Sequence, residues 1–161
     1  MEKDIRVFAR ECALRRLDRR ECSTQDVIRH LVQKEVPSDI ALEVVSHLQT
    51  LNLISDERFA RLLAREQALR GKGPHVVRQK LREKGIQLDL EKIKTLIEEV
   101  SLTDELTAAR ALLARKYPDA WQDKKQELKA LQALVRRGYS FSVAREALAS
   151  QEHFESDDFK S

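Results

Sequence analysis

Aromatic residues, glycine, proline and cysteine are all scarce in this sequence of 161 residues. Phe, Trp and Tyr make up 5% of it, so its cores must be built mostly of Leu, Val, Ile and Ala. Four glycines and three prolines leave few interruptions, and the alternation of apolar and polar residues that marks a strand is absent. These absences argue against a sheet and favour long helices.

The sequence also lacks the patterns that mark reactive, metal or membrane sites. Cys12 and Cys22 form no CxxC motif, so we expect two reduced thiols packed in or near a helix. None of the four histidines stands at metal-ligand spacing with Cys, Asp or Glu, so no metal site is expected. No apolar run is long enough for a signal peptide or a membrane span, which predicts a cytoplasmic protein. Without a nucleophile elbow, paired carboxylates or a dinucleotide fingerprint, we expect no enzyme activity and no cofactor.

Charge, by contrast, is abundant and unevenly distributed. Asp, Glu, Lys and Arg make up 35% of the residues, with a net charge of only +3. Residues 57–84 contain nine Lys or Arg and three Glu, whereas residues 87–105 contain two Lys and six acids. Such alternation creates strong local fields that the small net charge conceals.

Apolar residues recur at spacings of three and four along nearly the whole chain, which is the period of an amphipathic helix. Pro74 suits the first position of a helix, and Gly85 suits a left-handed helix end. We therefore predict an all-α protein with nine helices, over 4–20, 23–34, 39–51, 56–70, 74–84, 89–100, 103–117, 121–137 and 140–150. The expected N-caps include Ser23 or Thr24, Thr103, and Ser140 or Ser142.

A repeated pattern lies within these helices, at offsets of 50 and 53 residues. Each copy has apolar residues four apart, then a basic residue, a turn residue and a large apolar side chain. The copies are Val27, Leu31, Lys34 and Val36; Val77, Leu81, Lys84 and Ile86; and Ala130, Leu134, Arg137 and Tyr139. The turn residues are Glu35, Gly85 and Gly138.

One such unit buries too little surface to be stable alone, whereas stacked units share their cores. We therefore predict three tandem three-helix repeats, similar to helix-turn-helix units, over 1–53, 54–101 and 102–150. They are expected to form an elongated, curved array followed by an acidic flexible tail over 151–161.

Three blocks in the middle repeat, LISDERFA (53–60), RGKGP (70–74) and LREKGI (81–86), together with LVRRGY (134–139), resemble the RecX family of bacterial recombinase regulators. The resemblance implies three three-helix repeats without a catalytic site or cofactor. It also implies that the partner is RecA and the RecA–DNA filament, in whose groove the protein lies. There it inhibits recombinase, ATPase and co-protease activities in DNA repair and the SOS response. His75-Val76 and Lys80 depart from the family pattern.

Basic residues gather on two consecutive helices of the middle repeat and on a helix of the third. Such a run is often only a solvated helix face, but its convergence on a single region favours binding to a negatively charged partner. The candidate partner-binding and DNA-binding residues are Arg58, Arg61, Arg65, Arg70, Lys72, Arg78, Lys80, Arg82, Lys84, Lys124, Lys125, Lys129, Arg136 and Arg137. We expect a monomer that binds RecA and that binds DNA weakly and without sequence preference.

The turn at 71–74 has two interpretations, a simple turn between helices or a helix N-terminus whose N–H groups bind an anion. Two other functions also stay open. Short helices joined near glycine suit a helix-turn-helix transcriptional regulator, in which Arg78 or Arg82 reaches base edges. A helical-repeat adaptor without a role on nucleic acid is the third hypothesis.

Overall fold

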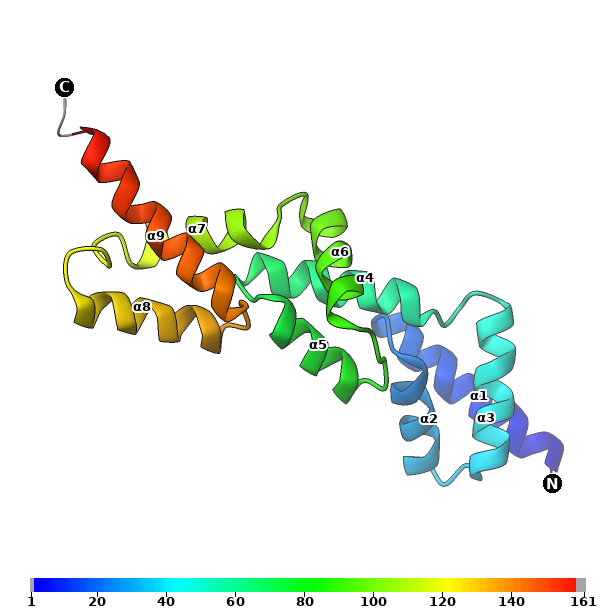
Figure 1. Cartoon of the computed structure of the whole chain (residues 1–161). Coiled ribbons are helices and arrows are strands. Elements are labelled where there is room, and N and C mark those ends of the chain that lie inside the picture. Colours follow the sequence, from blue (N-terminus) through cyan, green and yellow to red (C-terminus); the bar gives the residue numbers. More distant parts are fainter. Residues whose placement is uncertain (1, 159–161) are drawn as a thin grey trace. The chain divides into compact units, whose positions relative to one another are not determined.

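The computed structural model describes the backbone of residues 2–158 and the side chains of residues 4–151. These residues form nine α-helices and no strand, as predicted (Figure 1). The helices are α1 (Glu2–Arg19), α2 (Thr24–Gln33), α3 (Ser38–Thr50), α4 (Asp56–Leu69), α5 (Pro74–Glu83), α6 (Leu90–Ser101), α7 (Glu105–Lys116), α8 (Lys124–Arg136) and α9 (Phe141–Asp158). None of them combines the length and apolar character that crossing a bilayer requires.

Side-chain caps set several helix starts. The Ser23 hydroxyl accepts a hydrogen bond from the N–H of Asp26 at 3.2 Å, which selects Ser23 over Thr24 as the cap of α2. The expected cap Thr103 is wrong. Asp104 caps α7 instead, since its carboxylate accepts the Thr107 N–H at 2.7 Å. Asp123 likewise caps α8, which therefore begins three residues later than expected.

The last helix is longer than the sequence indicated. We expected α9 to end at residue 150, but it continues to Asp158. Residues 151–158, assigned to a flexible tail, are therefore helical, and residues 159–161 lie outside the described residues.

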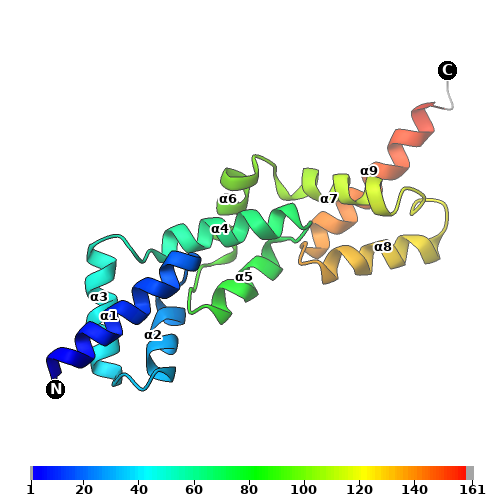
Figure 2. The same ribbon diagram turned by 180° about the vertical axis from the view of Figure 1, so that it is seen from behind.

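The described chain divides into two compact units. Unit 1 contains the residues up to Leu62 together with Leu81–Gln87. Its core lies where α1, α2 and α3 pack together (Figure 2), and it is apolar but not aromatic. Fully buried members of this core include Ala9, Ala13, Val27, Leu31 and Leu48.

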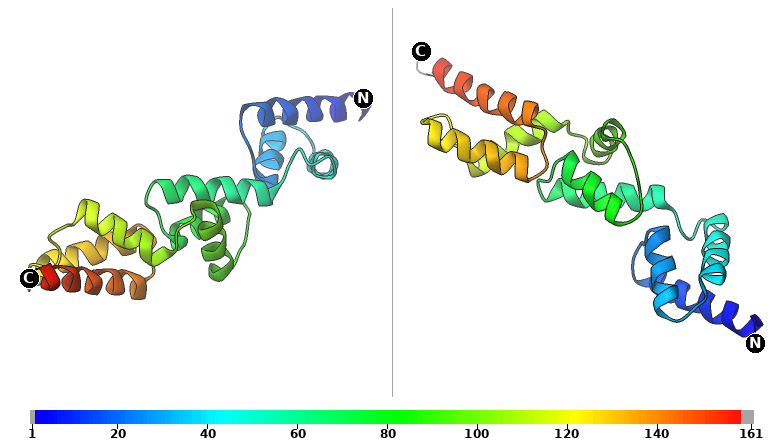
Figure 3. Two further views of the ribbon diagram at one scale, coloured as in Figure 1. Left: turned by 90° about the horizontal axis from the view of Figure 1, so that it is seen from above. Right: turned by 60° about the horizontal axis from the view of Figure 1, so that its bottom comes forward.

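Unit 2 contains Leu63–Lys80 and the residues from Leu88 onward. In its third repeat, α9 lies against both α7 and α8 (Figure 3). Small residues at the centre of this core let the helices approach closely; Ala109, Ala130, Ala144 and Ala147 are all buried. The boundary between the units runs through α4 and α5, so the repeat boundaries read from the sequence stay predictions.

The register of the internal repeat is confirmed. Its three turn residues have left-handed backbones, with φ of 64° at Glu35, 76° at Gly85 and 97° at Gly138. In each copy the next residue donates its N–H to the carbonyl five positions earlier, as in a Schellman helix end. These bonds join Val36 to Leu31 (3.1 Å), Ile86 to Leu81 (2.9 Å) and Tyr139 to Leu134 (3.2 Å).

The start of α5 docks directly on the turn between α8 and α9. The Gly73 N–H donates to the Arg137 carbonyl at 2.8 Å, and the His75 N–H donates to the Gly138 carbonyl at 2.9 Å. A Cβ on Gly73 would lie 2.6 Å from backbone atoms of Gly138 and Tyr139. Glycine is therefore required at position 73 by contact with the third repeat.

This docking predicts an order of stability for two glycine variants. Gly71→Ala strains a backbone with φ of 70°, but its new Cβ meets only side chains at 3.4 Å or beyond, so we expect a loss of about 1 kcal/mol. Gly73→Ala must push two backbones apart, and we expect a loss of about 3 kcal/mol. Urea unfolding followed by the fluorescence of Trp121, the single tryptophan, measures both.

A simple turn would give the opposite order of stability, because Gly71 has a positive φ and Gly73 does not. A Gly73→Ala variant as stable as Gly71→Ala would therefore contradict docking as the reason for this glycine.

Candidate functional site

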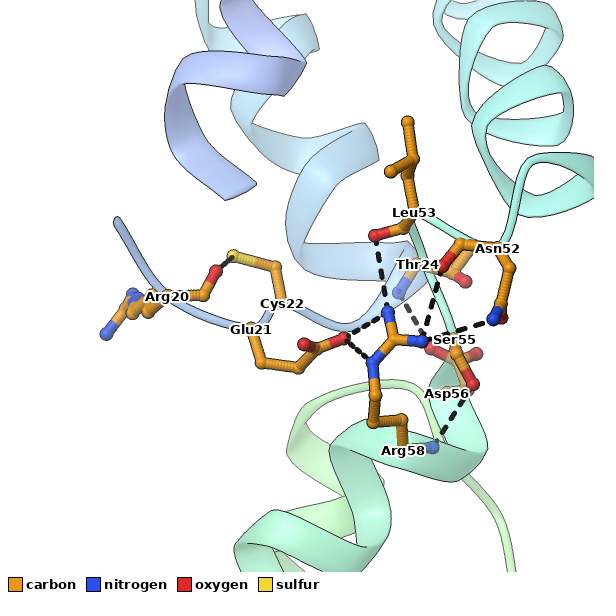
Figure 4. Close-up of polar contacts among 9 residues, drawn as sticks. All are labelled: Arg20, Glu21, Cys22, Thr24, Asn52, Leu53, Ser55, Asp56 and Arg58. Carbon is orange, nitrogen blue, oxygen red and sulfur yellow. Dashed lines mark hydrogen bonds and ion pairs between the residues drawn. The ribbon is translucent and has the colours of Figure 1, made fainter. Parts of the chain in front are cut away.

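Of the fourteen candidate cations, Arg58, Lys84 and Arg137 bond to distant parts of the described chain. Arg58 makes the largest set of contacts. Its guanidinium contacts the Glu21 carboxylate at 2.7 Å and donates to the carbonyls of Asn52 and Leu53 at 3.2 and 3.4 Å (Figure 4). The hydrogen bond to Glu21 raises the pKa of Arg58 above its ordinary value. Arg58 thereby ties the loop after α1 and the loop after α3 to the start of α4.

Next to this contact, a second bond joins the same elements. The Thr24 N–H at the start of α2 donates to the Asp56 carboxylate at 2.8 Å (Figure 4). Neither the Arg58–Glu21 contact nor the Thr24–Asp56 bond can be foreseen from local sequence, because the paired residues lie 37 and 32 positions apart.

Lys84 and Arg137 close equivalent copies of the repeat, and each contacts the repeat before it. The Lys84 ammonium lies 3.0 Å from the Asp26 carboxylate, whose side chain is only 7% exposed. Arg137 donates to the Arg70 carbonyl at 3.4 Å. Both residues therefore hold repeats together in this structure.

The remaining cations of the middle repeat differ in how open they are. Arg61, Arg65 and Arg82 are exposed, whereas Lys72, Arg78 and Lys80 are half-buried. Arg70 is exposed and pairs with Glu66 at 2.7 Å, one helical turn away. Because both of those side chains are more than half exposed, this pair is weak and readily exchanged for another partner.

The basic residues of α8 form the most open set. Lys124, Lys125, Lys129 and Arg136 are all exposed. Lys125, Lys129 and Arg136 stand at i, i+4 and i+11, so they share one face of the helix. Among the described residues, no acid pairs with these four side chains.

The turn at 71–74 is not an open anion site. Two N–H groups at the start of α5, those of Gly73 and His75, are already bound to carbonyls. Because those donors are occupied, the interpretation of this turn as an anion-binding helix N-terminus is wrong.

A groove that sequence reasoning missed lies in unit 2. Its volume is about 510 Å³, and it is lined by the end of α4, the 71–74 turn, α6, the 102–104 loop and α7. Buried Tyr139 also lines the groove, and burial raises the pKa of its phenol. Two strongly exposed leucines, Leu69 and Leu102, also line it. In sequence these segments are far apart, so no local pattern could have revealed the groove.

In the part of the chain that the structure describes, no three His, Cys, Asp or Glu side chains gather closely enough to hold a metal ion. The arrangement therefore consists of an apolar groove and basic helix faces, which suits the binding of macromolecules.

Comparison with known proteins identifies the same three-helix repeats. Models of the first, second and third three-helix domains of RecX match residues 9–48, 55–90 and 103–148. Regulatory protein RecX of Halorhodospira halophila is 30% identical over 142 residues, which cover 88% of this chain and 86% of that protein. The crystal structure of RecX from Lactobacillus salivarius shares the fold, with a TM-score of 0.77 at 21% identity over 93% of this chain and 98% of that one.

Other relatives are longer. Regulatory protein RecX of Streptococcus sanguinis is 28% identical over 141 residues, which cover 87% of this chain but 54% of that protein. The chain thus spans about half the length of the streptococcal relatives that it matches.

Fold and comparisons together define an all-α protein of three-helix repeats in a class of regulatory proteins. The chain belongs to the RecX family.

The division between packing cations and open cations can be tested on α5 and its end. Lys84→Met leaves the buried Asp26 carboxylate without its nearest partner, so we expect a loss of about 1–3 kcal/mol. Arg82→Met, two residues away and exposed, should change stability by less than about 0.5 kcal/mol. Thermal unfolding followed by circular dichroism compares the two, and equal midpoints would mean that Lys84 is as free as Arg82.

Proposed function

We propose that this protein binds the RecA filament on DNA and restrains its recombinase, ATPase and co-protease activities. Membership of a family named for regulation supports a regulatory role. The family resemblance in the sequence supplies RecA as the partner. We propose further that the protein works as a cytoplasmic monomer.

The observation that carries this proposal is the set of open cations on successive repeats. Arg82 on α5 and Lys125, Lys129 and Arg136 on α8 are exposed, and no described acid pairs with them. Repeats that each present basic side chains suit a partner whose negative charge also repeats along its length. A nucleoprotein filament is such a partner, because its phosphates and its protein subunits recur at a regular interval.

The docking of α5 argues against a helix-turn-helix transcription regulator. In such proteins the N-terminal residues of the recognition helix enter the major groove of DNA. Here Gly73 and Pro74 are buried, and the N–H groups of Gly73 and His75 bond to the turn between α8 and α9. The backbone at the start of α5 is thus bound to the third repeat, which disfavours its insertion into a DNA groove.

The test is the hydrolysis of ATP by RecA on single-stranded DNA as the protein is titrated in. The wild type should inhibit. Lys125→Glu/Lys129→Glu should need at least about tenfold more protein for half inhibition, because each reversed charge repels the partner it was meant to attract. If both lysines contact phosphate, the slope of log affinity against log salt should also fall by about 2.

A matched control reverses Arg10 and Arg15 on α1, which are exposed and outside the proposed basic faces. It changes the net charge by the same amount, so it should leave inhibition unchanged. Equal weakening by both variants would reduce the effect to net charge, and a wild type that fails to inhibit RecA would overturn the proposal.

A further inference from the structure

The groove in unit 2 has a feature that folding alone does not explain, the backbone of Leu102. This residue ends α6 in the left-handed conformation, with φ of 58° and ψ of 27°. Leucine is disfavoured there because its Cβ crowds the following carbonyl, whereas glycine and asparagine are tolerated. Its side chain is 89% exposed, so it gains almost no burial in return.

The first repeat makes the usual choice at the corresponding place. Just after α3 the left-handed residue is Asn52, with φ of 57°. The equivalent helix end in the second repeat therefore has a leucine, which strains a left-handed backbone more than asparagine does and exposes an apolar side chain to water. Strain of this kind, kept where the structure does not need it, is typical of functional positions.

Leu102 does not stand alone. Leu69, at the end of α4, is 79% exposed and lines the same groove. The apolar residues Ile97, Val100 and Leu112 also line the groove. Two exposed leucines beside an apolar wall offer a surface for other apolar side chains, and offer no donor to a phosphate.

The charges around the groove indicate the character of what it binds. Arg65, Lys72 and Arg115 line it, and no described acid pairs with them. Two of its acids are already engaged. Asp104 caps α7, and Glu105 accepts hydrogen bonds from the N–H and hydroxyl of Ser140.

Glu98 is then the one acid of the lining whose carboxylate bonds to no described group. The lining contains four cations, since Lys94 pairs with Glu105 at 3.8 Å, and three acids, so its net charge is +1 and complements an acidic neighbour.

From this geometry we propose that the groove docks a protein segment of the partner that presents apolar side chains flanked by acidic ones. This inference rests on the proposed function, and it assigns protein contacts and DNA contacts to two different surfaces. The groove contacts the protein subunits of the filament, whereas the basic face of α8 contacts phosphate.

The decisive variant is Leu102→Asn, which places in the second repeat the residue type that the first repeat uses. Asparagine suits a left-handed helix end, so the variant should unfold at the same temperature as the wild type or higher. It should nevertheless need at least about tenfold more protein to half-inhibit ATP hydrolysis by RecA on single-stranded DNA. Its salt slope should equal that of the wild type, because no charge is lost.

Leu51→Asn is the matched control, since Leu51 is also an exposed leucine at a helix end but lies outside the groove. It should inhibit like the wild type. If wild type inhibits and Leu102→Asn inhibits equally well, the groove inference fails while the proposed function stands. Equal weakening by both variants would also overturn it. A wild type that does not inhibit overturns the function itself. Sedimentation then measures the oligomeric state. If the wild type is a dimer and Leu102→Asn is a monomer, the groove binds a second copy of this chain and the inference is wrong.

Discussion

The close approach of one repeat to the next is the constraint on which the rest of this structure depends. The second helix of a repeat begins against the place where the second helix of the following repeat ends. In unit 2, Gly73 and His75 bond to the carbonyls of Arg137 and Gly138, and a Cβ on Gly138 would come 2.6 Å from the Val76 nitrogen. The equivalent place in unit 1 uses an ion pair of Lys84 with Asp26, while a Cβ on Gly85 would strike Gln25. Backbone bonds and an ion pair therefore serve the same purpose at two successive junctions.

This constraint explains why a basic residue closes the second and third copies of the repeat. Lys84 and Arg137 precede the left-handed turn residue, and this position turns their side chains toward the preceding repeat. Lys34 closes the first copy, which has no preceding repeat among the three, and it is exposed. In the second and third copies, the basic residue at this position therefore stabilises the contact between repeats. The charges available to a partner are those displaced from it, such as Arg82 and Lys129, which explains how one chain carries both packing cations and open ones.

The sequence was sufficient for whatever depends on local periodicity. Apolar residues four apart located the buried pairs, and the glycines at 85 and 138 located Glu35 as a third left-handed residue, which the structure confirms. It was insufficient wherever a contact joins distant segments. Arg58 shares a helix face with Arg61 and Arg65 in the sequence pattern. In the structure its guanidinium instead bonds to Glu21, which lies 37 positions away. The cap of α7 was misplaced by one residue, because Thr103 and Asp104 are both good caps and geometry alone decides between them. Leu102 was unforeseeable, since nothing local marks a leucine for a left-handed backbone.

In the function that we propose, an apolar groove and a basic face make different contributions to the recognition of a filament. Contacts to phosphate supply affinity without sequence preference, and they would hold the protein equally well on bare DNA. Contacts from leucine require a complementary apolar surface, which only a protein subunit provides. Because unit 2 carries both the groove and the basic face, we expect strong binding only where protein and nucleic acid are present together. The two kinds also respond differently to salt, since screening weakens the basic face and leaves the groove almost unaffected. Selectivity for filament over bare DNA should therefore increase with ionic strength even as total affinity falls, a pattern that a purely electrostatic binder cannot produce.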